Sequence, residues 1–304
     1  MENLLKLYGE LLPVMAFVLA GYVVGRKFEF NSDYVSKPLI NVLLPLIVFT
    51  NMLDAEPSKL VTLPIVTFLL ALAMNYLAIP VQRKFATETD PLLLRSSFSF
   101  FNIAFFGIPI VKALFGEDSV SVLICIYLGS ALYGDTIGFY QVAKTKLSPK
   151  RARREVLSIP FLYVFVAGVI CKVFEVETPE VVKPALNVVS FIVSAAGMFI
   201  VGLQLGNVDF SKIRFPYFAR ILGIRTIAAA VIVTLLILAV SSIAGNVEED
   251  DIRMLALVPL FPVAANVTVF AAFLKADEEQ SSLLVFLSMI LSVILVSIAT
   301  LIMG

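Results

Sequence analysis

The chain has 304 residues and no formal net charge at neutral pH, with 23 basic and 23 acidic side chains. Hydrophobic residues make up 60% and charged residues 15%, whereas soluble domains are about half apolar and a quarter charged. A soluble fold of this size could not bury so much apolar surface, so the composition predicts a protein embedded in a lipid bilayer. The neutral balance gives no reason to expect nucleic acid as a partner, and the absence of histidine excludes imidazole chemistry.

Ten stretches are apolar enough to form membrane-crossing helices, each of which needs about 20 residues. In chain order they are residues 5–25, 34–53, 59–81, 92–115, 119–143, 156–174, 181–205, 215–244, 252–274 and 280–303. Turn residues and charges separate them, as at Asn31-Ser32-Asp33 and in the acidic run 248–251. The sequence therefore predicts an all-α integral membrane protein with ten transmembrane helices.

Most of the 23 basic residues lie in the loops after the odd-numbered stretches or at the adjoining helix ends. The richest of these loops follows the fifth stretch, within residues 144–154. Because loops rich in lysine and arginine stay in the cytoplasm, we expect a multi-pass cell-membrane protein with both termini on the extracytoplasmic side. We interpret the basic loop as a topology signal rather than a nucleic-acid patch.

The two halves of the chain resemble each other at an offset of about 146 residues. Residues 37–42 align with 183–188, sharing Lys, Pro, Asn and Val in the same order, and Phe28-Glu29 aligns with Phe174-Glu175. Five spans per half would insert the second copy upside down. The pattern predicts two inverted repeats, residues 1–147 and 148–304, an arrangement typical of secondary transporters.

The fourth and ninth stretches contain proline and glycine residues that interrupt a helix, and polar residues beside them. The candidates for substrate binding are Asn102, Gly107 and Pro109 in the fourth and Pro262, Asn266 and Thr268 in the ninth. Proline removes a backbone donor, glycine loosens the turn, and the freed backbone groups cannot face lipid. We expect broken helices 4 and 9 to cross beside a polar site whose helix N-termini suit an anion. Simple proline kinks without a ligand are the alternative.

Further polar residues lie within the predicted spans. Asn41 and Asn51 in the second span and Gln204 in the seventh are additional candidates for binding substrate. Asp135 and Arg225 are charges at membrane depth, where ionisable groups are costly and usually paired or functional. Either the two form a structural ion pair, or Arg225 contacts an anionic substrate while Asp135 titrates.

Four segments together resemble the auxin efflux carrier family, the PIN-like transporters of plants, bacteria and archaea, and the resemblance extends over essentially the whole chain. They are residues 41–49, 102–109, 196–205 and 262–266. The resemblance implies crossed, broken helices 4 and 9, a scaffold of spans 1, 2, 6 and 7 often used for dimerisation, and a moving transport domain of spans 3–5 and 8–10. It also implies an elevator-type carrier of small organic anions, auxin- or dicarboxylate-like, and not an enzyme.

Other functions stay open at this point. The expected architecture is also similar to that of sodium–proton and bile-acid transporters, so a sodium-coupled organic-anion symporter is the first alternative. An intramembrane protease is suggested only by Tyr133-Gly134-Asp135, and that chemistry needs two facing carboxylates. A receptor or passive scaffold would leave the paired breaks unexplained. No metal site or cofactor is expected, and the coupling ion would be H⁺ or Na⁺.

Overall fold

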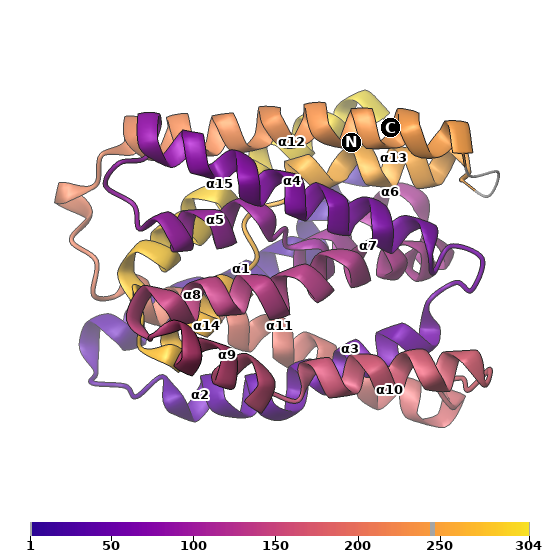
Figure 1. The fold of residues 1–304 in the computed structure, drawn as a ribbon, viewed down its shortest axis with the longest axis horizontal. Coiled ribbons are helices and arrows are strands. Elements are labelled where there is room, and N and C mark those ends of the chain that lie inside the picture. The colour runs from indigo at the N-terminus through magenta and orange to yellow at the C-terminus, as the bar shows by residue number, and fades with distance from the viewer. Residues whose placement is uncertain (1, 244–246, 304) are drawn as a thin grey trace.

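The computed structural model describes residues 2–243 and 247–303, which form an all-helical bundle whose longest helices lie roughly along one axis (Figure 1). The first half contains α1 Glu2–Lys27, α2 Asp33–Pro38, η1 Leu39–Leu43, α3 Leu44–Asp54, α4 Thr62–Phe85, α5 Pro91–Ser99, η2 Ile103–Gly107, α6 Ile108–Phe115, η3 Glu117–Ser119, α7 Val120–Tyr133, η4 Gly134–Gly138 and α8 Phe139–Lys146. The second half contains α9 Pro149–Ser158, α10 Phe161–Val173, η5 Glu180–Val182, α11 Lys183–Leu205, η6 Phe210–Lys212, α12 Phe215–Ile243, α13 Glu249–Leu257, η7 Val258–Leu260, α14 Asn266–Leu274 and α15 Glu278–Met303. Here η denotes a π-helical or 3₁₀ turn.

Seven helices in the described residues are long and apolar enough to cross a membrane. They are Leu4–Lys27, Asp33–Asp54, Thr62–Phe85, Val120–Lys146, Glu180–Leu205, Phe215–Ile243 and Glu278–Ile302. The pair α9 and α10, bent by 43°, would make an eighth. The predicted sixth span, 156–174, is divided between two helices. Ile159 is extended before Pro160, and this extended residue ends α9. The end of the predicted eighth span, residue 244, lies outside the described residues, as do the outermost residues of the predicted repeats, 1 and 304.

The other two predicted stretches do not form single helices. Residues 92–115 are divided between α5 and α6, and residues 252–274 between α13 and α14, with extended or irregular backbone at 100–102 and 261–265. Helices of eight or nine residues are too short to cross a bilayer alone, so length and composition give fewer than ten spans. The all-helical fold and both interruptions are confirmed, whereas the ten-span inverted repeat stays a prediction.

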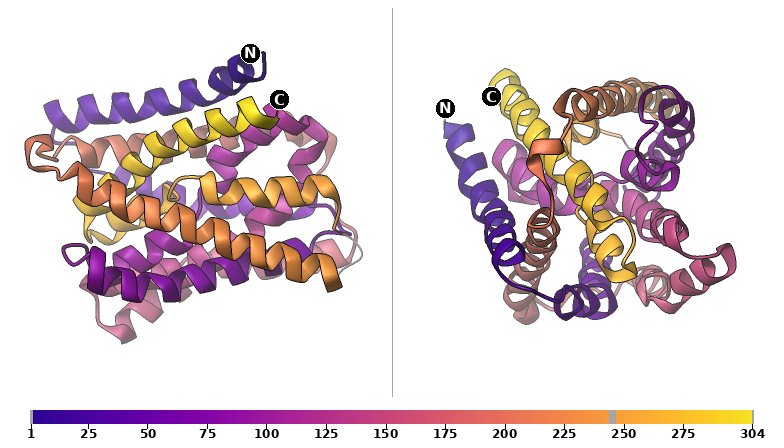
Figure 2. Two further views of the ribbon diagram at one scale, coloured as in Figure 1. Left: turned by 90° about the horizontal axis from the view of Figure 1, so that it is seen from above. Right: turned by 90° about the vertical axis from the view of Figure 1, so that its left-hand side faces the viewer.

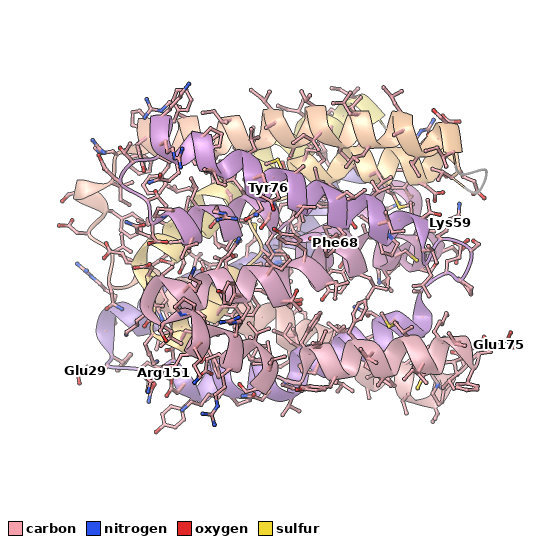
Figure 3. The ribbon with its side chains drawn as sticks, in the orientation of Figure 1. Glu29, Lys59, Phe68, Tyr76, Arg151 and Glu175 are labelled. Atoms are coloured by element: carbon pink, nitrogen blue, oxygen red, sulfur yellow. The ribbon has the colours of Figure 1, made fainter. Side chains whose placement is uncertain are left out.

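The bundle has two distinct ends and brings its termini together. The two termini lie close to each other in both views of Figure 2. Glu29 and Arg151 lie at one end of the molecule, and Lys59 and Glu175 lie at the opposite end (Figure 3). The first end carries the loops in which most of the basic residues were found.

Helices α1 and α11 pack with their backbones in contact. A Cβ atom added to Gly21 would lie 2.1 Å from the carbonyl oxygen of Phe199, and one added to Gly202 would lie 2.1 Å from that of Val18. Glycine is needed at both positions because any side chain would collide with the neighbouring backbone. One helix comes from each half of the chain, so this contact joins the two halves.

Candidate functional site

The two interrupted helices are joined through their backbones. Phe101 and Val263 form an isolated antiparallel β-bridge. The amide of Asn102 donates to the carbonyl of Pro262 at 2.9 Å, and the amide of Ala264 donates to the carbonyl of Phe100 at 3.0 Å. We call residues 100–102 and 261–265 the helix crossing. At this crossing the C-terminal ends of α5 and η7 meet the N-terminal ends of η2 and α14.

Proline and glycine shape the crossing in different ways. Pro262 lies within the break itself and uses its carbonyl to hold Asn102. Pro109 instead lies past the break, where the π-helical turn η2 continues into α6. A Cβ atom on Gly107 would approach the ring of Phe261 to 2.9 Å, so glycine lets η2 pack closely on the other broken helix.

Arg225 satisfies the carbonyl groups of the crossing from α12. Its side chain is 2% exposed, and Nε, Nη1 and Nη2 donate to the carbonyls of Ser97, Phe261 and Phe100 at 3.1, 3.1 and 3.4 Å. The guanidinium carbon also lies 4.1 Å from the ring centroid of Phe101. These carbonyls close the C-terminal ends of α5 and η7, where helix dipoles are negative, so the cation caps both ends together.

Asp135 reaches the crossing from η4, a π-helical turn of the kind often found at functional sites. Its side chain is 4% exposed, and Oδ1 accepts a hydrogen bond from Nδ2 of Asn266 at 3.1 Å. The preceding Gly134 lets this turn pack on Phe100, since a Cβ there would lie 2.4 Å from the ring. Asp135 therefore lies at the N-terminal end of α14, which Asn266 begins.

The expected Asp135–Arg225 ion pair is not formed in the part of the chain that the structure describes. All three guanidinium nitrogens of Arg225 donate to backbone carbonyls, and the carboxylate of Asp135 is bonded by Asn266. The sequence places the two charges at comparable depth in the membrane. In the structure, Arg225 bonds the C-terminal ends of the broken helices, whereas Asp135 lies at an N-terminal end.

Several buried polar atoms around the crossing have no hydrogen-bond partner among the described residues. They are Oγ of Ser96, Oγ of Ser97, Nδ2 of Asn102, Oγ of Ser130 and Oγ1 of Thr268. Leaving a buried polar atom unpaired costs about 1–3 kcal/mol. Groups of this kind in native proteins are commonly satisfied by water, an ion or a ligand. These atoms are therefore candidates for contact with water, an ion or a ligand.

The remaining predicted binding residues are placed differently. The exposed side chain of Asn41 donates to the carbonyl of Lys37 in its own helix at 2.9 Å. Asn51 is half-buried on α3, and its side chain forms no hydrogen bond among the described residues. Gln204 lines a cavity at the end of α11. The structure thus brings Asn102, Pro262 and Asn266 together but gives Asn41 and Gln204 other surroundings, because rotation about each helix axis sets where a side chain points.

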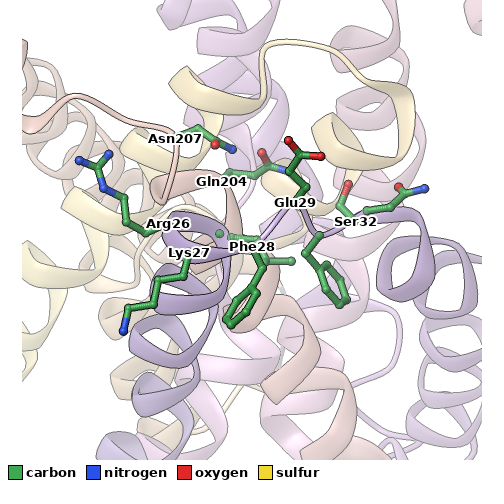
Figure 4. Close-up of a pocket in the computed structure, with 11 residues that line it drawn as sticks. Arg26, Lys27, Phe28, Glu29, Ser32, Gln204 and Asn207 are labelled. Atoms are coloured by element: carbon green, nitrogen blue, oxygen red, sulfur yellow. The ribbon is translucent and has the colours of Figure 1, made fainter.

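Two cavities open at opposite ends of the bundle. One, of about 500 Å³, lies between the α1–α2 loop and the end of α11 and is lined by Glu29 and Gln204 (Figure 4). The other, of about 560 Å³, lies between the end of α3, the start of α7 and the α10–α11 loop. The α1–α2 and α10–α11 loops are segments that the sequence aligns, so matching parts of the two halves border the two cavities.

A buried ion pair near the end that carries Glu175 escaped the sequence analysis. Lys59 and Asp251 are both 2% exposed and are bonded to each other, and Nζ of Lys59 lies 3.4 Å from Oε1 of Glu248. Asp251 also accepts from the amide of Glu248 at 2.7 Å and caps α13. Lys59 begins the predicted third span, but it precedes α4 and lies outside the helices that are long and apolar enough to cross a membrane. Burial lowers its pKa, but the two carboxylates outweigh burial and raise the pKa above its ordinary value. Acidic residues at the start of a helix allow the cap of α13 to be predicted from the sequence. The ion pair could not be predicted in this way, because Lys59 and Asp251 are 192 residues apart.

Comparison with known proteins supports a transport role in general terms. No protein-family model matches the chain. A protein of Methanothermobacter thermautotrophicus, named an uncharacterized transporter, is 24% identical to the chain over 174 residues. The match covers 55% of this chain and 58% of the relative, so the chain spans little more than half the length of the protein it matches. With the apolar helices, this similarity indicates a transporter-like, multi-pass membrane protein.

Proposed function

We propose that the chain is a secondary transporter of small organic anions, with ten spans arranged as two inverted five-helix repeats and the substrate bound at the helix crossing. The observation that carries the proposal is the antiparallel pairing of two interrupted helices beside unpartnered buried polar atoms. The similarity to a protein named a transporter supports transport rather than enzymatic activity. The motif resemblance to auxin efflux carriers supports an anionic substrate.

The anion is proposed to bind at the N-terminal side of the crossing. Nδ2 of Asn102 and the hydroxyl of Thr268 are buried donors without an acceptor among the described residues, and the N-terminal end of α14 adds partial positive charge. Arg225 is assigned a structural role, because three of its five N–H groups donate to carbonyls of the broken helices. Its role in this proposal is to hold the two broken helices in place.

Asp135 gives the proposal a reason for ion coupling. An ionised Asp135 and a substrate carboxylate would repel each other strongly in this buried region. We therefore expect the anion to bind together with a proton or a sodium ion at Asp135. Sodium is the alternative suggested by the oxygen atoms of Asp135, Asn266 and Thr268, and its involvement would favour a symporter of the bile-acid type.

The remaining structural features fit an elevator-type carrier. The backbone contact of α1 with α11 supports a rigid scaffold of spans 1, 2, 6 and 7. Spans 3–5 and 8–10 would then move as the transport domain. We place the protein in the cell membrane as a homodimer, with its basic end in the cytoplasm and both termini outside.

Uptake by purified protein in proteoliposomes tests this proposal. Labelled malonate, malate and indole-3-acetate are offered in turn, with a proton gradient, a sodium gradient or neither. We expect at least one anion to accumulate when a gradient is imposed. Uptake of cations or neutral solutes alone would contradict the anion assignment.

A matched pair of variants tests the location of the substrate. Asn102→Ala removes the unpartnered donor at the crossing, whereas Asn41→Ala removes an exposed amide that bonds only its own helix. We expect the first to lower uptake by about 10-fold to 100-fold, since a hydrogen bond to a charged group contributes about 1.5–3 kcal/mol. The second should transport like the unaltered protein. Equal activity of the two variants would remove the crossing as the binding site.

A further inference from the structure

Helix α9, in the connection between the two halves, carries a concentrated positive charge. Lys150, Arg151, Arg153 and Arg154 are all exposed, and Arg151 projects outward at its end of the molecule in Figure 3. At about 100° per residue the four cations fall within an arc of about 160°. The opposite face of the helix is occupied by the fully buried Ala152 and packs against α8. One face of α9 is therefore basic and open.

These four cations differ from three other cations at the same end, which are paired with carboxylates. Lys275 and Lys37 both pair with Asp33, at 2.8 and 2.9 Å, and Arg214 pairs with Glu88. None of the four α9 cations forms an ion pair within the described part of the chain. Only Nε of Arg153 has a partner, a carbonyl in its own helix at 3.4 Å. The charge of α9 is thus uncompensated by the protein.

The surroundings of α9 indicate what compensates this charge. The helix bends by 43° into α10, which is apolar enough to complete a membrane span. At the junction Leu157 is 55% exposed and Tyr163 is 60% exposed, and the hydroxyl of Tyr163 donates to the carbonyl of Leu157 at 2.9 Å. Apolar and aromatic side chains next to lysine and arginine are typical of a helix at the boundary between headgroups and acyl chains.

We propose that the basic face of α9 binds the phosphate headgroups of anionic phospholipids, with Leu157 and Tyr163 against their acyl chains. Four clustered basic residues beside a membrane span suit such lipids, because each contributes to attraction toward an anionic membrane surface. A free phosphate ion would make no use of the adjoining apolar side chains. This inference does not depend on the substrate or on transport, since it concerns a surface away from the helix crossing.

Thermal unfolding of the full-length protein in neutral detergent tests the proposal. Phosphatidylglycerol, phosphatidylcholine or inorganic phosphate is titrated in low salt, and the shift of the unfolding midpoint gives an apparent affinity. We expect phosphatidylglycerol to raise the midpoint, with little response to the other two. The variant K150Q/R151Q/R153Q/R154Q should bind phosphatidylglycerol more weakly by about fivefold for each residue replaced.

Two control variants separate lipid binding from general effects of charge and folding. K150R/R151K/R153K/R154K keeps the charge and should keep the response. R26Q/K27Q/R83Q/K84Q removes four exposed cations from the ends of α1 and α4 and should also keep it. Equal weakening in this last variant, an unchanged response in the quadruple α9 variant, or an equal response to phosphatidylcholine or inorganic phosphate would overturn the proposal.

Discussion

The two sides of the helix crossing contain opposite charges and are satisfied to different degrees. On the carbonyl side, Arg225 donates to three backbone oxygens and lies over an aromatic ring. On the amide side, Asp135 has a single hydrogen bond from Asn266, and the side chains of Asn102 and Thr268 keep buried atoms without partners. The charge on the first side makes three hydrogen bonds to the protein, whereas the second side keeps buried polar atoms without partners among the described residues.

This contrast separates a structural charge from a candidate functional one. A buried cation that donates to fixed backbone acceptors holds the chain in one arrangement. Buried donors without acceptors cost stability until a ligand or an ion arrives. Depth in the membrane alone would assign the same importance to Asp135 and Arg225, and only their partners distinguish them.

The largest effect is expected from Arg225→Ala. The substitution leaves the buried carbonyls of Ser97 and Phe261 without their side-chain donor, removes one of the two donors to Phe100 and removes the contact with Phe101, so we expect the protein to lose about 3–5 kcal/mol of stability. Denaturant or thermal unfolding in detergent measures this loss. The matched control is Arg220→Ala on the same helix, which removes a similar bond to the carbonyl of Phe85 and a similar ring contact at an exposed position. A loss as small as that of the control, within about 1 kcal/mol, would mean that Arg225 does not hold the crossing.

A smaller effect of opposite sign is expected from Thr268→Val. The hydroxyl of Thr268 is buried and unpaired, so replacing it with a methyl group should stabilise the substrate-free protein by about 1 kcal/mol. The same change should weaken binding of the transported anion. Ser288→Ala is the control, because its hydroxyl accepts from the amide of Val263 at 2.9 Å and its removal should destabilise the crossing. Destabilisation by Thr268→Val would show that the hydroxyl already has a partner.

The smallest effect on stability is expected from Asp135→Asn. Asn266 can still donate to the amide oxygen that replaces the carboxylate, so stability should change by less than about 1 kcal/mol. Uptake, however, should no longer depend on a proton or sodium gradient. Unfolding and flux measured on the same preparation separate these two results. A stability loss comparable to that of Arg225→Ala would make Asp135 a structural charge as well and remove the contrast.

Much of the local structure could be predicted from the sequence because it depends on neighbours in the chain. Each of the ten apolar stretches contains helix, and the fourth and ninth are both interrupted as expected. The interruption in the fourth lies at residues 100–102, next to Asn102, whereas Gly107 and Pro109 lie within the continuous helical segment that follows it. The sequence predicted that the two broken helices cross, but it did not predict the pairing of Phe101 with Val263. Backbone hydrogen bonds between distant segments leave no local pattern in the sequence.

What the sequence could not provide was rotation about each helix and the choice among distant partners. Asn41 is polar and lies within a span, yet its helix turns it outward. Arg225 was expected to bond Asp135 or a substrate, but backbone carbonyls, which every residue carries, were the acceptors. The pairing of Lys59 with Asp251 depends on contact between chain segments 192 residues apart.

The glycine contact between α1 and α11 constrains how the two halves can move. Where backbones touch at Gly21 and Gly202, no layer of flexible side chains separates the two helices. Sliding by even one residue, about 1.5 Å, would bring bulkier neighbours into the space that only a hydrogen atom now fills. We therefore expect α1 and α11 to stay fixed relative to each other, and any large displacement has to take place in the helices around this pair.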